Sequence, residues 1–84
     1  MSRKTKTTVS WESIGKRHGL TRFANAVREA AHDDNRVGDY DLTLIRPNYL
    51  ESEAPTELIV EIRGDVRARD FVAEVLAGEH GAWD

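Results

Sequence analysis

Two stretches of regular alternation constrain the fold of this chain more than any other feature of its sequence. Apolar side chains fall at every second position of residues 39–46 and 57–63, namely at Tyr40, Leu42, Leu44, Leu58, Val60 and Ile62. Side chains two residues apart lie on the same face of a β-strand, so each stretch predicts a strand with one buried face. Pro47 ends the first strand, and residues 47–56, which contain two prolines, predict an extended loop between the two strands.

Apolar residues with helical spacing precede this strand pair. Ser10 can cap a short helix over residues 11–18, which Gly19 ends. A longer apolar stripe predicts a second helix over about residues 21–33, with Thr21 as its cap.

A third helix is predicted after the strand pair. Gly64 breaks the second strand, Asp65 can cap a helix over residues 66–77, and Gly78 closes this helix. Residues 5–10 are rich in β-branched side chains, which favour a brief strand or an arm at a sheet edge.

This order of elements predicts an α+β fold in a small two-layer single domain. A helical pair is followed by a two- or three-stranded antiparallel sheet and a C-terminal helix, with the helices on one face of the sheet. Residues 1–4 and 79–84 are expected to be flexible ends. The expected core consists of the large apolar side chains of these elements: Trp11, Ile14, Leu20, Phe23, Val27, Leu42, Leu44, Leu58, Val60, Ile62, Phe71, Val72, Val75 and Leu76.

Size and composition exclude several classes of function. The chain has 84 residues and no cysteine, which leaves room for one small core and excludes disulfides, thiolate nucleophiles and Cys-ligated zinc. No spacing of nucleophiles or acid–base groups indicates a catalytic site, so we expect a protein that is not an enzyme and binds no cofactor. The longest apolar runs are triplets, so no membrane span is expected, and the lack of cysteine suits the cytoplasm.

The histidines and one acidic pair give weak signals. His18, His32 and His80 are far apart and lack the helical spacing of metal ligands, so no metal site is expected. Asp39 and Asp41 share one strand face, but a solvated sheet edge accounts for this pattern.

Charge is unevenly divided along the chain, although its net value is only −3. Residues 1–36 contain eight Lys/Arg and four Asp/Glu, a net of +4, whereas residues 37–84 contain four Arg and eleven Asp/Glu, a net of −7. A basic surface attracts phosphates and an acidic one repels them. Any contact with nucleic acid should therefore involve the first part of the chain, whereas the second part suits a basic protein or nucleoprotein surface.

Residues 14–22 resemble the turn of helix-turn-helix DNA-binding proteins, in which a short helix ends at a glycine before a recognition helix. The resemblance implies a recognition helix over the second predicted helix, with the strand pair acting as a wing. The groove and phosphate contacts would come from Lys16, Arg17, Thr21, Arg22, Asn25 and Arg28. His18, Asn25 and Arg28 stand where these families have apolar residues. Glu51, Glu53 and Glu57 stand in the proposed wing, where phosphates would approach.

The acidic part of the chain suggests a different function. Tyr49 in the long loop and Trp83 near the end of the sequence are candidate anchors for a partner, because aromatic residues are frequent at interface hot spots. The first hypothesis is a regulatory or inhibitory protein that binds and occludes a larger macromolecule through an acidic surface. Its expected contact residues are Tyr49, Glu51, Glu53, Glu57, Glu61, Asp70 and Glu74.

In this hypothesis the carboxylates take the place of phosphates against Lys and Arg of the partner. Small, cysteine-free acidic domains of this kind are common among phage and mobile-element regulators, including inhibitors of CRISPR effectors. The analogy is one of size and charge. DNA binding remains the alternative, and the oligomeric state does not follow from the sequence.

Overall fold

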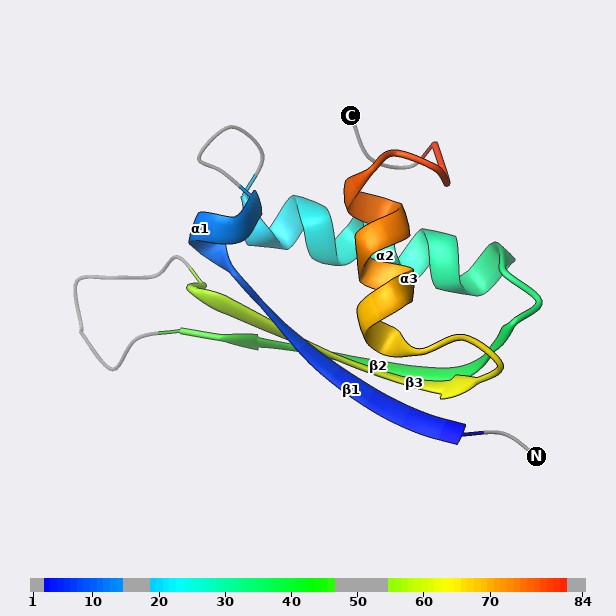
Figure 1. Ribbon diagram of the computed structural model, residues 1–84. Helices are drawn as coiled ribbons and strands as arrows, with labels where there is room; N and C mark the ends of the chain where they lie inside the picture. The colour runs from blue at the N-terminus through cyan, green and yellow to red at the C-terminus, as the bar shows by residue number, and fades with distance from the viewer. Residues whose placement is uncertain (1–2, 15–18, 47–54, 82–84) are drawn as a thin grey trace.

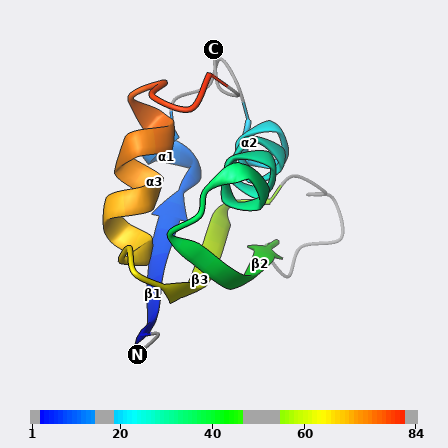
Figure 2. The ribbon, with the colours of Figure 1, turned by 90° about the vertical axis from the view of Figure 1, so that its right-hand side faces the viewer.

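A computed structural model describes residues 3–14, 19–46 and 55–81 of the chain. The elements follow one another in the order β1 (Arg3–Ser10), α1 (Trp11–Ile14), α2 (Leu20–Asp33), β2 (Val37–Ile45), β3 (Glu57–Gly64) and α3 (Ala68–Leu76). The three strands form one layer, and the helices lie together on one side of it (Figures 1 and 2). The two-layer α+β fold predicted from the sequence is thus confirmed.

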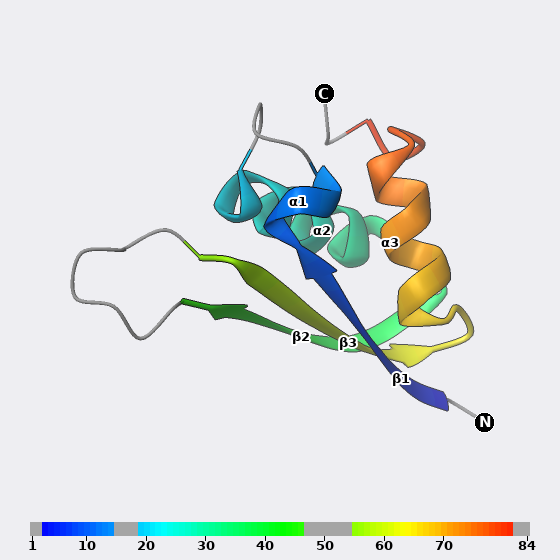
Figure 3. The same cartoon turned by 60° about the vertical axis from the view of Figure 1, so that its left-hand side comes forward.

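The sheet has the strand order β1-β3-β2, and both neighbours of β3 run antiparallel to it. β1 and β2 are therefore parallel to each other with β3 between them, which is a split β-α-β arrangement. Residues 5–10, expected as a strand or an arm, belong to a full edge strand that begins at Arg3. Lys4 also lies in this strand. The sheet thus has two edges, one formed by β1 and the other by β2 (Figure 3).

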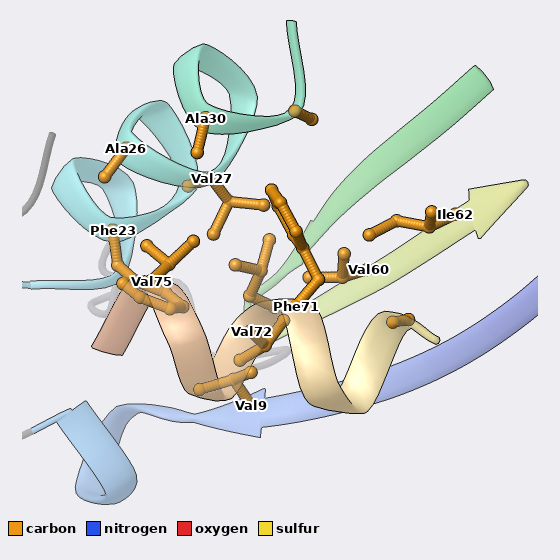
Figure 4. Close-up of a cluster of buried hydrophobic side chains, with 14 of the residues drawn as sticks. Val9, Phe23, Ala26, Val27, Ala30, Val60, Ile62, Phe71, Val72 and Val75 are labelled. Carbon is orange, nitrogen blue, oxygen red and sulfur yellow. The ribbon is translucent and has the colours of Figure 1, made fainter. Parts of the chain in front are cut away.

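The core lies between the helices and the inner face of the sheet. Leu58, Val60 and Ile62 of β3 are completely buried, as are Phe23 of α2 and Phe71 of α3. Figure 4 shows Val60 and Ile62 on the sheet and Phe71 on the helix that covers them. Burying an aromatic or branched side chain contributes about 1.5–3 kcal/mol, so this layer supplies much of the fold's stability. Other core residues lie outside the expected set: Val9, Val37, Val66, Ala24, Ala26, Ala30, Ala31 and Ala68. Four expected core residues, Trp11, Leu42, Leu44 and Leu76, are only partly buried.

Most helix and strand ends lie within a few residues of the positions predicted from the sequence. Ser10 accepts a hydrogen bond from the backbone N–H of Ser13 at 3.3 Å, as expected of a cap. Thr21, however, is not a cap: α2 begins at Leu20, and Gly19 precedes it with a φ of 83°, a value that favours glycine. The helix predicted over residues 11–18 is described as α1 only to Ile14, and residues 15–18 lie outside the described part.

Gly64 does not break β3 but is its last residue. It stands opposite both Arg3 of β1 and Val37 of β2. A Cβ atom at position 64 would lie 2.1 Å from the backbone oxygen of Arg36, so only glycine lets the chain pass this close.

The start of α3 differs from the sequence prediction. Asp65 does not cap this helix; the residue before its first turn is Arg67, whose side chain makes no capping hydrogen bond. The hydroxyl of Thr5 in β1 instead accepts a hydrogen bond from the backbone N–H of Ala68 at 2.6 Å. α3 is therefore tied at its first turn to the edge strand β1. No helix in the described part is long and apolar enough to cross a membrane.

Candidate interaction surface

No helix covers the outer face of the sheet in the described part of the protein (Figure 3). Because Leu58, Val60 and Ile62 point into the core, the residues between them point outward. The strand register then places outward side chains in rows across β1, β3 and β2. From one end of the sheet these rows are Lys4–Arg63–Asp39, Lys6–Glu61–Asp41, Thr8–Ile59–Thr43 and Ser10–Glu57–Ile45.

Charge changes sign across this open face. β1 contributes the cations Lys4 and Lys6, whereas β2 contributes the anions Asp39 and Asp41, and all four residues are exposed. Two further carboxylates, Glu57 and Glu61, lie on β3, together with Arg63. We call Asp39, Asp41, Glu57 and Glu61 the acidic strip.

Two carboxylates of the acidic strip stand directly opposite each other. Asp41 of β2 pairs in register with Glu61 of β3 on the open face. Like charges directly opposite each other in adjacent strands destabilise a sheet. Glu61 is partly compensated by Lys4, whose Nζ lies 3.2 Å from its Oε2. Within the described residues, no side-chain hydrogen bond or ion pair compensates Asp41, which is exposed to solvent.

A hollow of about 210 Å³ lies at this position. Its lining consists of three acidic residues, two cations and one tyrosine: Asp39, Asp41, Glu61, Lys4, Arg63 and Tyr40. Asp39 and Asp41 were not among the contact residues expected from the sequence, because their spacing is also that of a solvated strand edge. The register of β2 against β3 places Asp41 opposite Glu61. The spacing of residues along one strand does not contain this information.

The predicted acidic residues do not form one surface. Glu57 and Glu61 lie on the open face, whereas Asp70 and Glu74 belong to α3, which packs on the other side of the sheet. Asp70 is exposed and pairs with Arg67 at 3.2 Å. Four residues lie outside the described part: the expected contacts Tyr49, Glu51 and Glu53, and the candidate anchor Trp83.

Glu74 belongs to a network that joins the end of α2 to α3. The Nη2 atom of Arg36 lies 2.7 Å from Asp34 Oδ2 and 2.6 Å from Glu74 Oε1. Nε of Arg36 also donates to Asp34 Oδ1 at 3.0 Å, and Nη1 donates to Glu74 Oε2 at 3.2 Å. His80 Nε2 lies 3.3 Å from Glu74 Oε1, and its ring lies 5.0 Å from that of Phe71. The charge of Glu74 is thus used within the fold.

The Arg36 guanidinium determines the protonation of this network. Its hydrogen bonds to Asp34 and Glu74 hold the pKa of both carboxyl groups below their ordinary values of 3.8 and 4.5. The same bonds raise the pKa of Arg36 above its ordinary value. All three side chains are therefore charged near neutral pH.

One imidazole and two carboxylates in this network have the chemistry of metal ligands. Ligand atoms of Asp34, Glu74 and His80 lie within 4.8 Å of one another. Arg36, however, binds both carboxylates between its nitrogens and supplies the positive charge that a metal would bring. The geometry is accounted for by the ion-pair network.

The predicted DNA-contacting residues of α2 all lie on one side of that helix. Thr21, Arg22, Asn25 and Arg28 are exposed, and the opposite side of α2 is buried. Arg28 Nη1 donates to Asn25 Oδ1 at 3.0 Å, so the two side chains form a local pair. Lys16 and Arg17, the expected phosphate contacts, lie outside the described residues.

All buried side chains in the described part are apolar. Acid–base chemistry in a desolvated pocket requires a buried or half-buried titratable pair, and the Arg36 network is the half-buried cluster of this kind in the described residues. Comparisons with family models, with curated proteins and with solved structures find no match for this chain.

Proposed function

We propose that this chain is a small non-enzymatic binding protein that covers a basic surface of a larger macromolecule with its acidic strip. One observation carries the proposal: Asp41 faces Glu61 on the open side of the sheet, with no ion pair for Asp41 among the described residues. This arrangement lowers stability in the free protein. A cation from a partner would relieve the repulsion between Asp41 and Glu61. Binding would then be more favourable by the free energy that this repulsion costs the free protein.

The mechanism proposed is occlusion. Carboxylates at strand spacing present a row of negative charge, which can replace phosphates against the Lys and Arg residues of a nucleic-acid-binding protein. Inhibitors of phage or mobile-element origin that act in this way have a comparable size and acidic balance, and they remain the nearest functional analogy. Under this mechanism, binding of the chain and binding of nucleic acid to the partner exclude each other.

The test uses the proteins of a nuclease-treated bacterial lysate that are retained on heparin, because this fraction is rich in nucleic-acid-binding proteins. We expect the wild-type chain to bind a component of this fraction, with an affinity that falls as salt increases. Asp41→Lys should weaken binding at least tenfold, because it places a like charge against the partner. Added duplex DNA should compete with the chain for the bound component.

The matched control is Glu12→Lys. This substitution changes the net charge equally, but at an exposed position of α1, away from the open face. It should leave binding within about twofold. Equal losses in the two variants would show a response to net charge alone and would contradict a role for the acidic strip. Circular dichroism of both variants verifies that they are folded.

DNA binding through α2 is a second candidate, favoured by the exposed row of Thr21, Arg22, Asn25 and Arg28. If α2 contacts DNA, duplex binding should depend steeply on salt and should be lost in Arg22→Ala and Arg28→Ala. Arg69→Ala, an exposed position on α3, is the control. Unchanged duplex affinity in both α2 variants would contradict this candidate.

A further inference from the structure

The edge of β2 lies beside a hollow between the sheet and α2. Tyr40 of β2 and the α2 residues Arg28, Glu29, His32 and Asp33 line this hollow, which has a volume of about 440 Å³. In the described part, β2 pairs only with β3, so its other edge is unpaired. Every second residue of an edge strand directs its backbone N–H and C=O away from the sheet.

The regular part of this edge is long enough for a short peptide to pair with it. The irregularity in the register falls between Val37 and Asp39, and pairing with β3 is continuous from Asp39 to Ile45. A strand added beside these residues would have one row of side chains next to the acidic strip. Its other row would face the hollow beside Tyr40.

Charge distinguishes the two edges of the sheet. β2 presents Asp39 and Asp41 outward, and their i, i+2 spacing equals the side-chain repeat of a strand. The hollow adds two carboxylates, Glu29 and Asp33, against one guanidinium, Arg28. β1 at the opposite edge presents Lys4 and Lys6 instead, so a basic segment is attracted to the β2 edge and repelled from the β1 edge.

From this geometry we propose that the chain binds an extended basic segment of its partner by β-strand addition to the free edge of β2. Lys or Arg at alternate positions of that segment pair with Asp39 and Asp41, and an apolar side chain between them enters the hollow beside Tyr40. Backbone hydrogen bonds supply affinity, and the alternation supplies specificity. This inference rests on the proposed function and specifies how the acidic strip recognises its partner.

The probe is a capped heptapeptide, Lys-Val-Lys-Thr-Lys-Val-Lys, titrated into the isotopically labelled protein and followed by NMR. A peptide of the same composition with its lysines in one block is the first control. We expect the alternating peptide to bind at least tenfold more tightly than the block peptide. Amide hydrogen exchange should slow at alternate residues within positions 39–44 and remain unchanged in β1.

Two N-methylated forms of the heptapeptide test the hydrogen bonds directly. One form carries N-methyl groups on the central Lys residues, at positions 3 and 5, and the other carries them on the two Val residues. These two sets direct their N–H groups to opposite edges of an extended peptide. Strand addition therefore requires that one form binds about tenfold more weakly or worse, while the other binds about as well as the unmodified peptide.

The outcomes separate this inference from the proposed function. Any one of three results would overturn strand addition. These are equal binding of both methylated forms, slower exchange of the β2 amides without alternation, and no binding of the heptapeptide. If the heparin-retained component still binds in an Asp41-dependent manner in that case, the proposed function stands. Loss of that dependence would overturn the proposed function and strand addition together.

Discussion

Asp41 of β2 and Glu61 of β3 are directly opposite partners on the face of the sheet that no helix covers in the described part. One row away, Asp39 is opposite Arg63. The same strand pair thus contains one repulsive and one attractive pair of charges, separated by two residues on β2. This difference provides an internal comparison for the energetic cost of the acidic strip.

Removing the charge of Asp41 should stabilise the protein, whereas removing that of Asp39 should destabilise it. Cross-strand pairs contribute about 0.2–1 kcal/mol, with a sign set by the charges. We expect the free energy of unfolding, measured in urea, to rise by an amount in this range in Asp41→Asn and to fall in Asp39→Asn. Changes of the same sign in both variants would show that register pairing does not determine these energies. Asp41→Asn should also weaken binding of the heparin-retained component.

Arg36 should contribute more to stability than an arginine with a single exposed partner, because it bonds to two carboxylates, Asp34 just after α2 and Glu74 in α3. Hydrogen bonds to charged groups contribute about 1.5–3 kcal/mol, and partial exposure of Arg36 reduces this. We expect Arg36→Met to lower the free energy of unfolding by about 1–2 kcal/mol. The control is Arg67→Met, which removes an exposed pair with Asp70 within one turn of α3. It should cost at most about 0.5 kcal/mol, and an equal cost in both variants would contradict the special role of Arg36.

Local patterns in the sequence were sufficient to predict the layers of the fold. Alternation identified β2 and β3, and helical spacing identified α2 and α3, because these periods follow from backbone geometry and from the need to bury one face. The position of β1 in the sheet was left open, because a short β-branched stretch does not determine which strand it will pair with.

Contacts that depend on register or on distant residues could not be predicted. Arg36 and Glu74 are 38 positions apart, and Thr5 and Ala68 are 63 apart. Asp65 looked like the cap of α3 because it precedes an apolar stripe, yet a hydroxyl from β1 takes that place. In the sequence, the acidic residues of α3 resemble those of β3, but the fold places the two groups on opposite sides of the sheet. Sequence spacing specifies a face within one element, but tertiary packing decides which faces meet.

The Arg36 network also predicts how stability depends on pH. The pKa values of Asp34 and Glu74 are lowered in the folded state, so the folded state binds protons less readily than the unfolded one. Their contribution to stability is therefore complete above about pH 5. It is lost as the pH falls through the ordinary values of 3.8 and 4.5 toward the lowered ones.

We expect the free energy of unfolding to decrease as the pH is lowered from 5 to 3, measured by urea titration at each pH. The double variant Asp34→Asn, Glu74→Gln should be less stable at pH 7 and should show a flatter acid limb. Glu79→Gln, at an exposed position outside the network, is the control and should keep the wild-type slope. An unchanged slope in the double variant would assign the acid sensitivity to other carboxyl groups.

The last prediction concerns the bond between the edge strand and α3. Thr5 Oγ1 accepts a hydrogen bond from the backbone N–H of Ala68, and Ala68 is completely buried. Thr5→Val preserves the shape and the strand preference of the side chain but leaves this N–H without its acceptor. Loss of a helix-capping bond costs about 1 kcal/mol, so we expect a decrease of this size in the free energy of unfolding and faster hydrogen exchange of the Ala68 amide. Thr5→Ser keeps the oxygen and should restore the slow exchange, whereas Thr8→Val, on the open face, should leave it unchanged. If Thr5→Val and Thr8→Val gave the same exchange rate at Ala68, the cap would have no energetic role, and α3 would be held on the sheet by its buried apolar side chains alone.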